Sequence, residues 1–198
     1  MTLPDESTLR RALDGYTAAV ERQGVAKLPG LDRWYRDELP GLIAARHPAH
    51  LTHSELVRLS EWKMARGVWR APNLVLVRGN DPAEVEATST RALSKIPHPT
   101  APISELAKLK GVGPATASAA ASAVAPDIYP FFDELVAAQL PGLGPVAWTL
   151  GYYSRYADAL RTAARDLGGE WTPVLLERAL WSHVGGKCGS HRDTVAQR

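Results

Sequence analysis

The stretch Leu109-Lys-Gly-Val-Gly-Pro-Ala-Thr-Ala117 joins two helix-forming segments and decides how the middle of the chain folds. A short apolar helix, predicted over 103–109, runs into Gly111-Val-Gly113, and an alanine-rich helix follows over 115–125. The two glycines permit a tight turn and bring bare backbone close to a ligand. Pro114 suits the first turn of the next helix, whose unpaired N–H groups form an anion site. This chemistry fits a helix-hairpin-helix that holds a phosphate, and equally a packing turn between two core helices.

The composition is that of a globular chain without a large excess of charge. The 198 residues are enough for one domain of good size, and a hydrophobic content of 45% supports a core. Because the formal net charge is only +2, a nucleic-acid site would have to come from local clusters of basic residues. The single cysteine, Cys188, excludes an intramolecular disulfide, a cysteine-ligated iron–sulfur cluster and a zinc finger.

Targeting and metal signals are weak. The first residues are acidic and amphipathic, without the apolar core of a signal peptide, and no run reaches the length of a membrane span. Only His47, His50 and His53 approach a metal-ligand spacing, in a predicted loop, so we expect no metal site there. We expect a cytoplasmic monomer with no membrane partner, associated with the nucleoid if the source is bacterial.

The remaining pattern predicts an all-α fold. Only 73–77 competes as a strand, and it fits equally well as a buried helical face. Thr52 with Glu55 forms a capping box, and Asp81 precedes a proline as the cap of another helix. We predict one helical domain over 1–184, in two layers, and a flexible tail over 185–198. The other predicted helices span 5–22, 30–46, 73–78, 131–140, 154–167 and 173–183.

The glycine stretch and a downstream carboxylate together resemble the signature of helix-hairpin-helix (HhH-GPD) DNA glycosylases. Residues 109–117 match the Leu-Pro-Gly-Val-Gly turn and the following Thr-Ala of that superfamily, with Lys110 in place of the usual proline. Tyr129-Pro-Phe-Phe-Asp133 is similar to the Phe-Pro-Ile-Leu-Asp segment that contains the catalytic aspartate of adenine-type members. Asp133 lies 22 residues after Gly111, which is the spacing those enzymes use. The chain resembles a divergent member without the iron–sulfur cluster.

This resemblance covers about residues 52–140 and implies a monofunctional glycosylase of base excision repair, a hydrolase acting on a damaged or mispaired base. Asp133 would stabilise the positive charge that develops on the sugar, or activate water. Glu61, in a Leu-Ser-Glu segment like that of adenine glycosylases, would be the acid. Ala115 stands where strand-cutting members carry a Schiff-base lysine, so strand cleavage by that route is not expected. The resemblance implies no cofactor beyond a sodium or potassium ion at the turn carbonyls.

Basic residues interleaved with tryptophan between positions 58 and 78 form a second candidate site. Cations bind phosphates, and an aromatic ring stacks on a flipped base. At the turn, N–H groups would bind phosphate while Lys110 adds charge. The predicted DNA contacts are Lys63, Arg66, Arg70, Lys110, Gly111, Val112, Gly113, Ala115 and Thr116. The predicted base pocket is formed by Trp62, Trp69 and Phe132.

A purely structural role is also possible for each of these residues, and two other functions therefore stay open. Asp133 could simply cap a helix, and the tryptophans could fill the core beneath a solvated basic face. A chain of that kind could be a non-catalytic DNA-binding module that keeps the hairpin without a base pocket. It could also be a helical interaction protein in which the glycine turn only packs.

Overall fold

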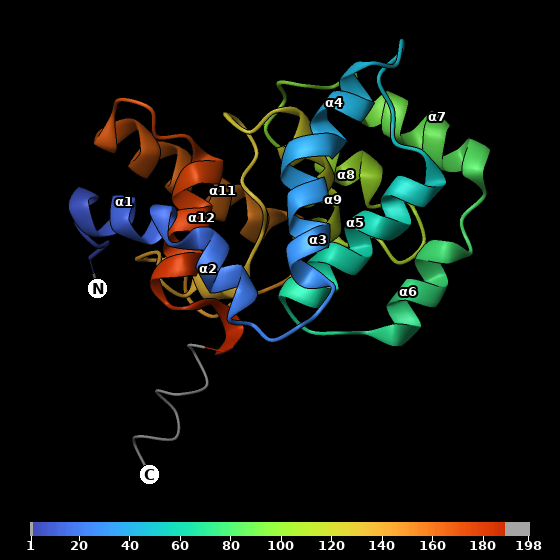
Figure 1. The fold of residues 1–198 in the computed structure, drawn as a ribbon. Helices are drawn as coiled ribbons and strands as arrows, with labels where there is room; N and C mark the ends of the chain where they lie inside the picture. Colours follow the sequence, from blue (N-terminus) through green and yellow to red (C-terminus); the bar gives the residue numbers. More distant parts are fainter. Residues whose placement is uncertain (1, 189–198) are drawn as a thin grey trace.

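The structure, a computed structural model, describes residues 2–188 and consists of helices and connecting loops, with no β-strand in that range (Figure 1). The helices are α1 (Glu6–Asp14), α2 (Tyr16–Glu21), α3 (Leu28–Arg33), the π-helix η1 (Trp34–Glu38), α4 (Leu39–Ala44), α5 (His53–Arg66), α6 (Ala71–Arg78), α7 (Pro82–Leu93), α8 (Ala101–Leu106), α9 (Pro114–Val124), α10 (Glu134–Ala137), α11 (Leu150–Leu167) and α12 (Pro173–His183). The all-α prediction is confirmed for these residues. Within them, no helix combines the length and apolar character that crossing a bilayer requires.

The helices form two groups that share one core (Figure 1). In one group, α12 contacts α1, α2, α10 and α11. In the other group, α5 contacts α3, α6, α7 and α9. The C-terminal half of α5 faces the junction, where the Trp62 ring lies 5.0 Å from the Phe131 ring. The buried side chains of both groups belong to a single hydrophobic cluster, so the junction is part of the core.

The helix starts follow the capping patterns of the sequence. Thr52 accepts a hydrogen bond from the N–H of Glu55, whose side chain bonds back to Thr52, as the capping box predicts. Asp81 caps α7. The boundaries differ elsewhere: the predicted helix 5–22 is divided at Gly15, and 30–46 contains the π-helical turn of η1 just before Pro40. Proline has no N–H to donate to the preceding turn, which accounts for a wider turn at that point.

The glycine turn, residues 107–113 between α8 and α9, is anchored on α6. Gly111 has a φ of +73°, and a Cβ added there would lie 2.8 Å from the carbonyl oxygen of Asn73 and from Cγ2 of Val77. The Asn73 amide donates to the Gly111 carbonyl at 2.8 Å. The Asn80 side chain accepts from the Lys110 N–H and donates to its carbonyl. The close approach that the sequence predicts at Gly111 is therefore made to α6.

The described part of the predicted tail contacts Gln23, just after the end of α2. The Gln23 amide donates to the Gly185 carbonyl at 3.0 Å and accepts from the Cys188 N–H at 3.0 Å. Residues 185–188 thus hydrogen-bond to the domain, while the rest of the predicted tail, 189–198, lies outside the described residues.

Candidate functional site

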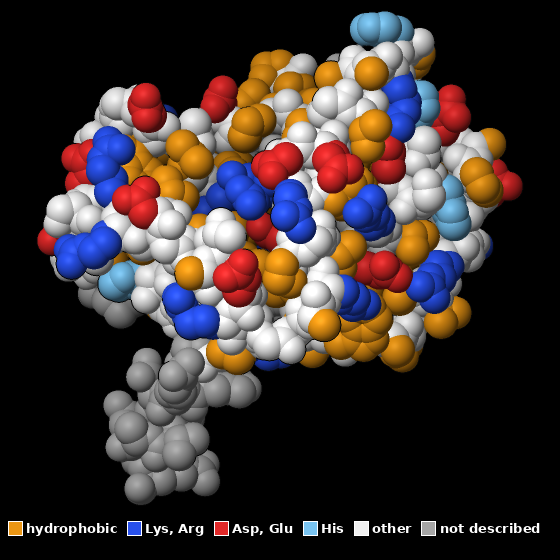
Figure 2. Space-filling view, viewed as in Figure 1, with side chains coloured by type: hydrophobic (Ala, Val, Ile, Leu, Met, Phe, Trp, Pro, Cys, Tyr) orange, Lys and Arg blue, Asp and Glu red, His pale blue; other side chains and the backbone are white. Residues whose placement is uncertain are grey.

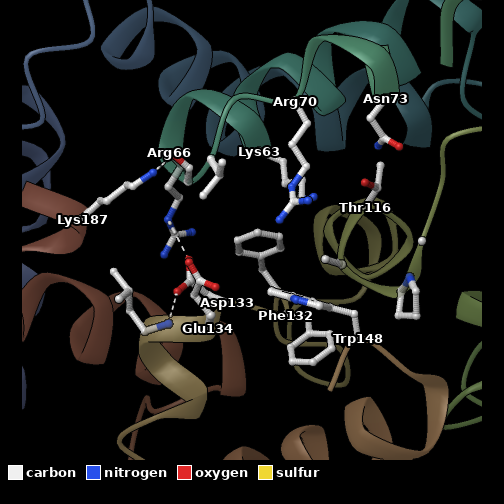
Figure 3. A pocket seen from close by; sticks show the side chains of 17 residues that line it. Lys63, Arg66, Arg70, Asn73, Thr116, Phe132, Asp133, Glu134, Trp148 and Lys187 are labelled. Atoms are coloured by element: carbon white, nitrogen blue, oxygen red, sulfur yellow. Dashed lines mark hydrogen bonds and ion pairs between the residues drawn. The ribbon is translucent and has the colours of Figure 1, made fainter. Parts of the chain in front are cut away.

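A cavity of about 250 Å³ lies between the glycine turn and Asp133 (Figure 3). Its walls come from segments that are far apart in the chain: the end of α5 with the following loop, the start of α9, the segment 131–135, and the residues Trp148 and Lys187. Gly113, Ala115 and Asp133 all line it. The two sequence anchors that are 22 positions apart therefore border the same space.

Asp133 is mostly buried, and its two carboxylate oxygens have different surroundings. Oδ1 accepts a hydrogen bond from the Leu135 N–H at 2.8 Å and so caps α10. Oδ2 lies 3.9 Å from Nε of Arg66. The predicted helix 131–140 is shortened to four residues of α10, which begins directly after Asp133. Capping uses one oxygen, so the helix-cap role and a role in the cavity are compatible.

The extended segment before Asp133 is held in place by hydroxyl groups. The Ser118 hydroxyl on α9 accepts from the Phe132 N–H at 2.9 Å. On α11, Tyr156 donates to the Phe131 carbonyl at 2.6 Å, and Tyr153 donates to the Pro130 carbonyl at 3.3 Å. These bonds satisfy buried backbone groups that no helix satisfies, and they set the position of the Asp133 backbone.

An aromatic wall faces the cationic side of the cavity. Phe132 lines the cavity as the sequence predicts, and its ring lies 4.8 Å from Trp148 and 5.6 Å from Tyr152. Trp148 is 45% exposed, so its ring remains open to a ligand. No function was predicted for Trp148 from the sequence, although three aromatic residues within 148–153 were a detectable signal. Two rings of this kind provide a surface on which a planar group can stack.

Arg66 requires a correction, because it is only 2% exposed and cannot reach a phosphate on the outer surface. Its Nη2 donates to Glu177 at 2.5 Å, while its Nε has no hydrogen-bond partner among the described residues. Glu177 lies on α12 and is also buried, and burial raises the pKa of its carboxyl to about 7. Glu177 was not among the predicted site residues; an acid on the apolar face of a helix, four residues before Trp181, was the available signal.

Lys63 and Arg70 project into the cavity from the same side (Figure 3). Burial, reinforced by the neighbouring Arg70 charge, lowers the pKa of the Lys63 ammonium group. Arg70 is exposed. Lys187 also lines the cavity, and its Nζ donates to the Gly67 carbonyl at 3.1 Å. Of the predicted contacts on the α5 side, Lys63 and Arg70 are thus placed where a ligand in the cavity would meet them.

The glycine turn offers fewer N–H groups than the sequence predicts. Val112 is a correction, because its N–H donates to the Leu109 carbonyl at 3.1 Å within the turn and its side chain is buried. Gly113 is the N-cap of α9, exposed, and has open space beyond its Cα. Ala115 and Thr116 lie in the first turn of α9 and line the cavity, where helical N–H groups have no partner within the helix. The Lys110 side chain is exposed and is not one of the residues that line the cavity.

Glu61 is not in the cavity, so its prediction as the acid beside Asp133 is wrong. It pairs with Arg78 at 2.8 Å and lines a separate surface groove with Arg58 and His53. Successive residues of an α-helix are rotated by about 100°. Glu61 and Lys63, two positions apart on α5, therefore point to opposite sides of the helix.

The two tryptophans of the predicted base pocket are also elsewhere. Trp62 is in the core, where it stacks on Tyr35 at 3.7 Å and donates its Nε1 hydrogen to Asp32. Trp69 is 45% exposed, with the Lys27 ammonium 3.7 Å from its ring centroid, and it borders a different cavity. Of the three predicted aromatic residues, only Phe132 lines the cavity that contains Asp133.

The outer surface shows no uniform basic stripe on the face drawn in Figure 2, where acidic and basic side chains are interleaved. Apolar side chains gather at its lower edge, near α6, where Val75 and Leu76 are exposed. Within residues 2–188, no group of three or more His, Cys, Asp and Glu side chains is arranged to hold a metal ion. Comparison of the chain with protein-family models, with curated proteins and with solved structures finds no match.

Proposed function

We propose that this chain is a DNA glycosylase of the helix-hairpin-helix (HhH-GPD) type, which hydrolyses the N-glycosidic bond of a damaged or mispaired base. One observation carries the proposal: Asp133, the aromatic wall and the start of α9 border a single cavity. An enzyme that works on a base must take it out of the helical stack into a pocket. A cavity of about 250 Å³ with stacking rings on one wall suits a single flipped base.

In this proposal Asp133 is the catalytic carboxylate. Loss of the base leaves positive charge on the sugar, and a nearby carboxylate stabilises that charge or activates the attacking water. Oδ2 is the oxygen left for this task, since Oδ1 caps α10. Phe132 and Trp148 provide the surface for the base. Ala115 carries no amine, so base release proceeds by attack of water.

The glycine turn would bind a phosphate next to the flipped nucleotide. Gly113, Ala115 and Thr116 contribute backbone N–H groups at the positive end of the α9 dipole. Arg70, which lines the cavity, and the exposed Lys110 of the turn add positive charge. No cofactor is assigned in this proposal. A sodium or potassium ion at the turn, which the resemblance implies, would compete for the carbonyls of Lys110 and Gly111, which already accept asparagine amides.

The test is base release from duplex oligonucleotides that carry uracil or an alkylated, deaminated or oxidised base. We expect the full chain to release at least one of them and Asp133→Asn to lose that activity while it still binds DNA. Asparagine is as good an N-cap as aspartate, so α10 is preserved in this variant. Asp127→Asn makes the same change at an exposed acid outside the cavity and serves as the matched control.

A second candidate function is a non-catalytic DNA-binding module. It is favoured by the position of Glu61, since this residue, the acid that the resemblance implies, lies outside the cavity, where the second carboxylate is that of Glu134. DNA binding without release of any base in the panel would support the module. Absence of DNA binding would reject both functions and leave a helical interaction protein.

A further inference from the structure

Positively charged side chains line the side of the cavity that faces its aromatic wall. Lys63 projects from α5, and Arg70 projects from the loop that follows this helix. Figure 3 shows both across the cavity from the Phe132 and Trp148 rings. Ammonium and guanidinium groups donate hydrogen bonds and accept none. A base that stacks on the two rings therefore has neighbours that offer positive charge and N–H donors.

The two carboxylates of the cavity reduce this positive character without cancelling it. Burial and, after it, the Arg70 charge lower the pKa of the Lys63 ammonium group. Asp133 and Glu134 act in the opposite direction with smaller effects, and the pKa stays lowered. The surroundings of Lys63 thus disfavour positive charge even with both acids present. A positively charged base brought beside Lys63 would meet the same penalty.

The Thr116 hydroxyl adds an uncharged donor to the cavity. Thr116 is buried in the first turn of α9 and lines the cavity. Within residues 2–188, its hydroxyl makes no hydrogen bond. Burying a hydroxyl without a partner is unfavourable, and a carbonyl oxygen of a bound base would supply the missing acceptor.

The chemistry of base release favours the same kind of base. A base that already carries a positive charge departs as a neutral molecule, whereas an uncharged base departs with negative charge developing on its ring. Donors placed beside the base stabilise that negative charge in the transition state. Lys63 and Thr116 provide such donors in the cavity that also contains Asp133, the carboxylate assigned to the sugar.

We propose that the cavity selects an uncharged base whose ring bears carbonyl oxygens, which is a deaminated or an oxidised base, and excludes bases made cationic by ring alkylation. The inference rests on the proposed function and names its substrate class. Lys63 is the specificity-determining residue, because its ammonium group donates to a carbonyl oxygen and repels a cationic ring. Arg70 adds to that repulsion.

The test compares two bases of the same shape that differ in charge. 7-Methylguanine carries a fixed positive charge, and 7-methyl-7-deazaguanine is its uncharged counterpart. Each is placed in the same duplex on a 2′-fluoro sugar, which resists base release, so affinity is measured with the wild-type chain and an intact Asp133. We expect the uncharged base to bind roughly tenfold more tightly or better, because a like charge brought into a desolvated site is strongly unfavourable.

Lys63→Gln removes the ammonium group and should narrow this difference to about threefold or less. Lys27→Gln is the matched control: it removes the same charge at Trp69, outside the cavity, and should preserve the difference. Circular dichroism shows whether each variant is folded. If Lys63→Gln does not fold, the comparison of the two bases with the wild-type chain still decides.

Duplexes with uracil, hypoxanthine or 8-oxoguanine on the same sugar distinguish the two sources of a carbonyl-bearing base. Preference for uracil or hypoxanthine over guanine assigns the cavity to deaminated bases, and preference for 8-oxoguanine assigns it to oxidised ones. The inference is overturned if none of the three binds more tightly than guanine. Equal affinity for the charged and uncharged methylated bases, or a difference that persists in folded Lys63→Gln, also overturns it.

Base release from ordinary deoxyribose separates this inference from the proposed function. Release of 7-methylguanine as fast as release of uracil, hypoxanthine and 8-oxoguanine would overturn the inference and leave the glycosylase. Selective binding of an uncharged lesion without release of any base would support the inference and reject the glycosylase.

Discussion

The Nε atom of Arg66 lies 3.9 Å from Oδ2 of Asp133, while Nη2 of the same guanidinium donates to Glu177. One buried cation thus stands between two carboxylates, one at the N-cap of α10 and the other on α12. The cluster joins α5, α10 and α12 at the junction of the two helix groups. It gives the Asp133 carboxylate a fixed neighbour in the cavity wall, which Arg66 also lines, and it makes Arg66 a structural residue as much as a residue of the site.

Arg66→Met should destabilise the fold by about 3–5 kcal/mol, because it leaves the buried Glu177 without its partner. Equilibrium denaturation in urea measures the loss. Arg58→Met makes the same change on an exposed position of α5 and should cost about 1 kcal/mol or less, the value of its contact with the Trp34 ring. Adding Glu177→Leu to Arg66→Met should recover much of the lost stability. Equal losses in Arg66→Met and Arg58→Met would contradict this account.

Stability should fall as the pH rises from about 4.5 to 7. Burial raises the pKa of Glu177 from 4.5 in the unfolded chain to about 7 in the fold. Between these values the folded chain binds more protons at this site than the unfolded chain, so the free energy of unfolding decreases with pH. Glu177→Gln stays neutral and should flatten that part of the profile. Urea denaturation over this pH range measures the free energy of unfolding of the wild-type chain and of Glu177→Gln. Parallel pH profiles of the two proteins would refute the prediction.

Gly111→Ala should lower the free energy of unfolding by about 1–3 kcal/mol, since alanine is strained at a φ of +73°. The new Cβ would also press on the Asn73 carbonyl and on Val77, each 2.8 Å away. Gly113→Ala is the internal control: its φ is −96°, open space surrounds it, and the change should cost about 1 kcal/mol or less. Thermal or chemical denaturation of both variants measures the difference between their losses of stability. No difference would mean that the turn is loosely packed on α6.

Binding to duplex DNA should weaken steeply as salt increases. A phosphate contact releases condensed counterions, so Lys110→Ala and Arg70→Ala should each reduce the slope of log affinity against log salt by about one. Fluorescence anisotropy at several salt concentrations measures the slopes. Arg10→Ala removes an exposed cation on α1, outside the cavity, and should leave the slope unchanged. Affinity that does not vary with salt would argue against a phosphate-mediated site.

Local signals in the sequence predicted most of the helices and one relationship within the site, between the glycine turn and Asp133. Caps such as Thr52 and Asp81 act within one turn, so they can be found without knowing the fold. The pairing of the glycine turn with Asp133 came from a resemblance in spacing, and the structure places both at one cavity. The same segment also predicted that Phe132 lines the pocket.

The errors concern side chains whose role depends on which face of a helix meets which neighbour. Glu61, Trp62 and Lys63 are consecutive on α5, yet they enter a surface groove, the core and the cavity. Charge and aromatic content alone could not separate them. Glu177 and Trp148 contribute from the C-terminal third of the chain, and only the packing of α12 and the loop before α11 on the central segment brings them to the site.

Trp148→Ala should weaken the interaction with a flipped base and leave the fold nearly unchanged. Stacking of one base on an aromatic side chain contributes about 1–3 kcal/mol, which corresponds to a loss of roughly fivefold or more in affinity for single-stranded DNA. Trp69→Ala provides a matched control, because both side chains are 45% exposed and only Trp148 lines the cavity with Asp133. Tryptophan is removed in both variants, so changes in surface hydrophobicity are comparable. Equal losses of affinity would mean that DNA meets the exposed rings indiscriminately, whereas a loss confined to Trp148→Ala would place the base against Phe132 and Trp148.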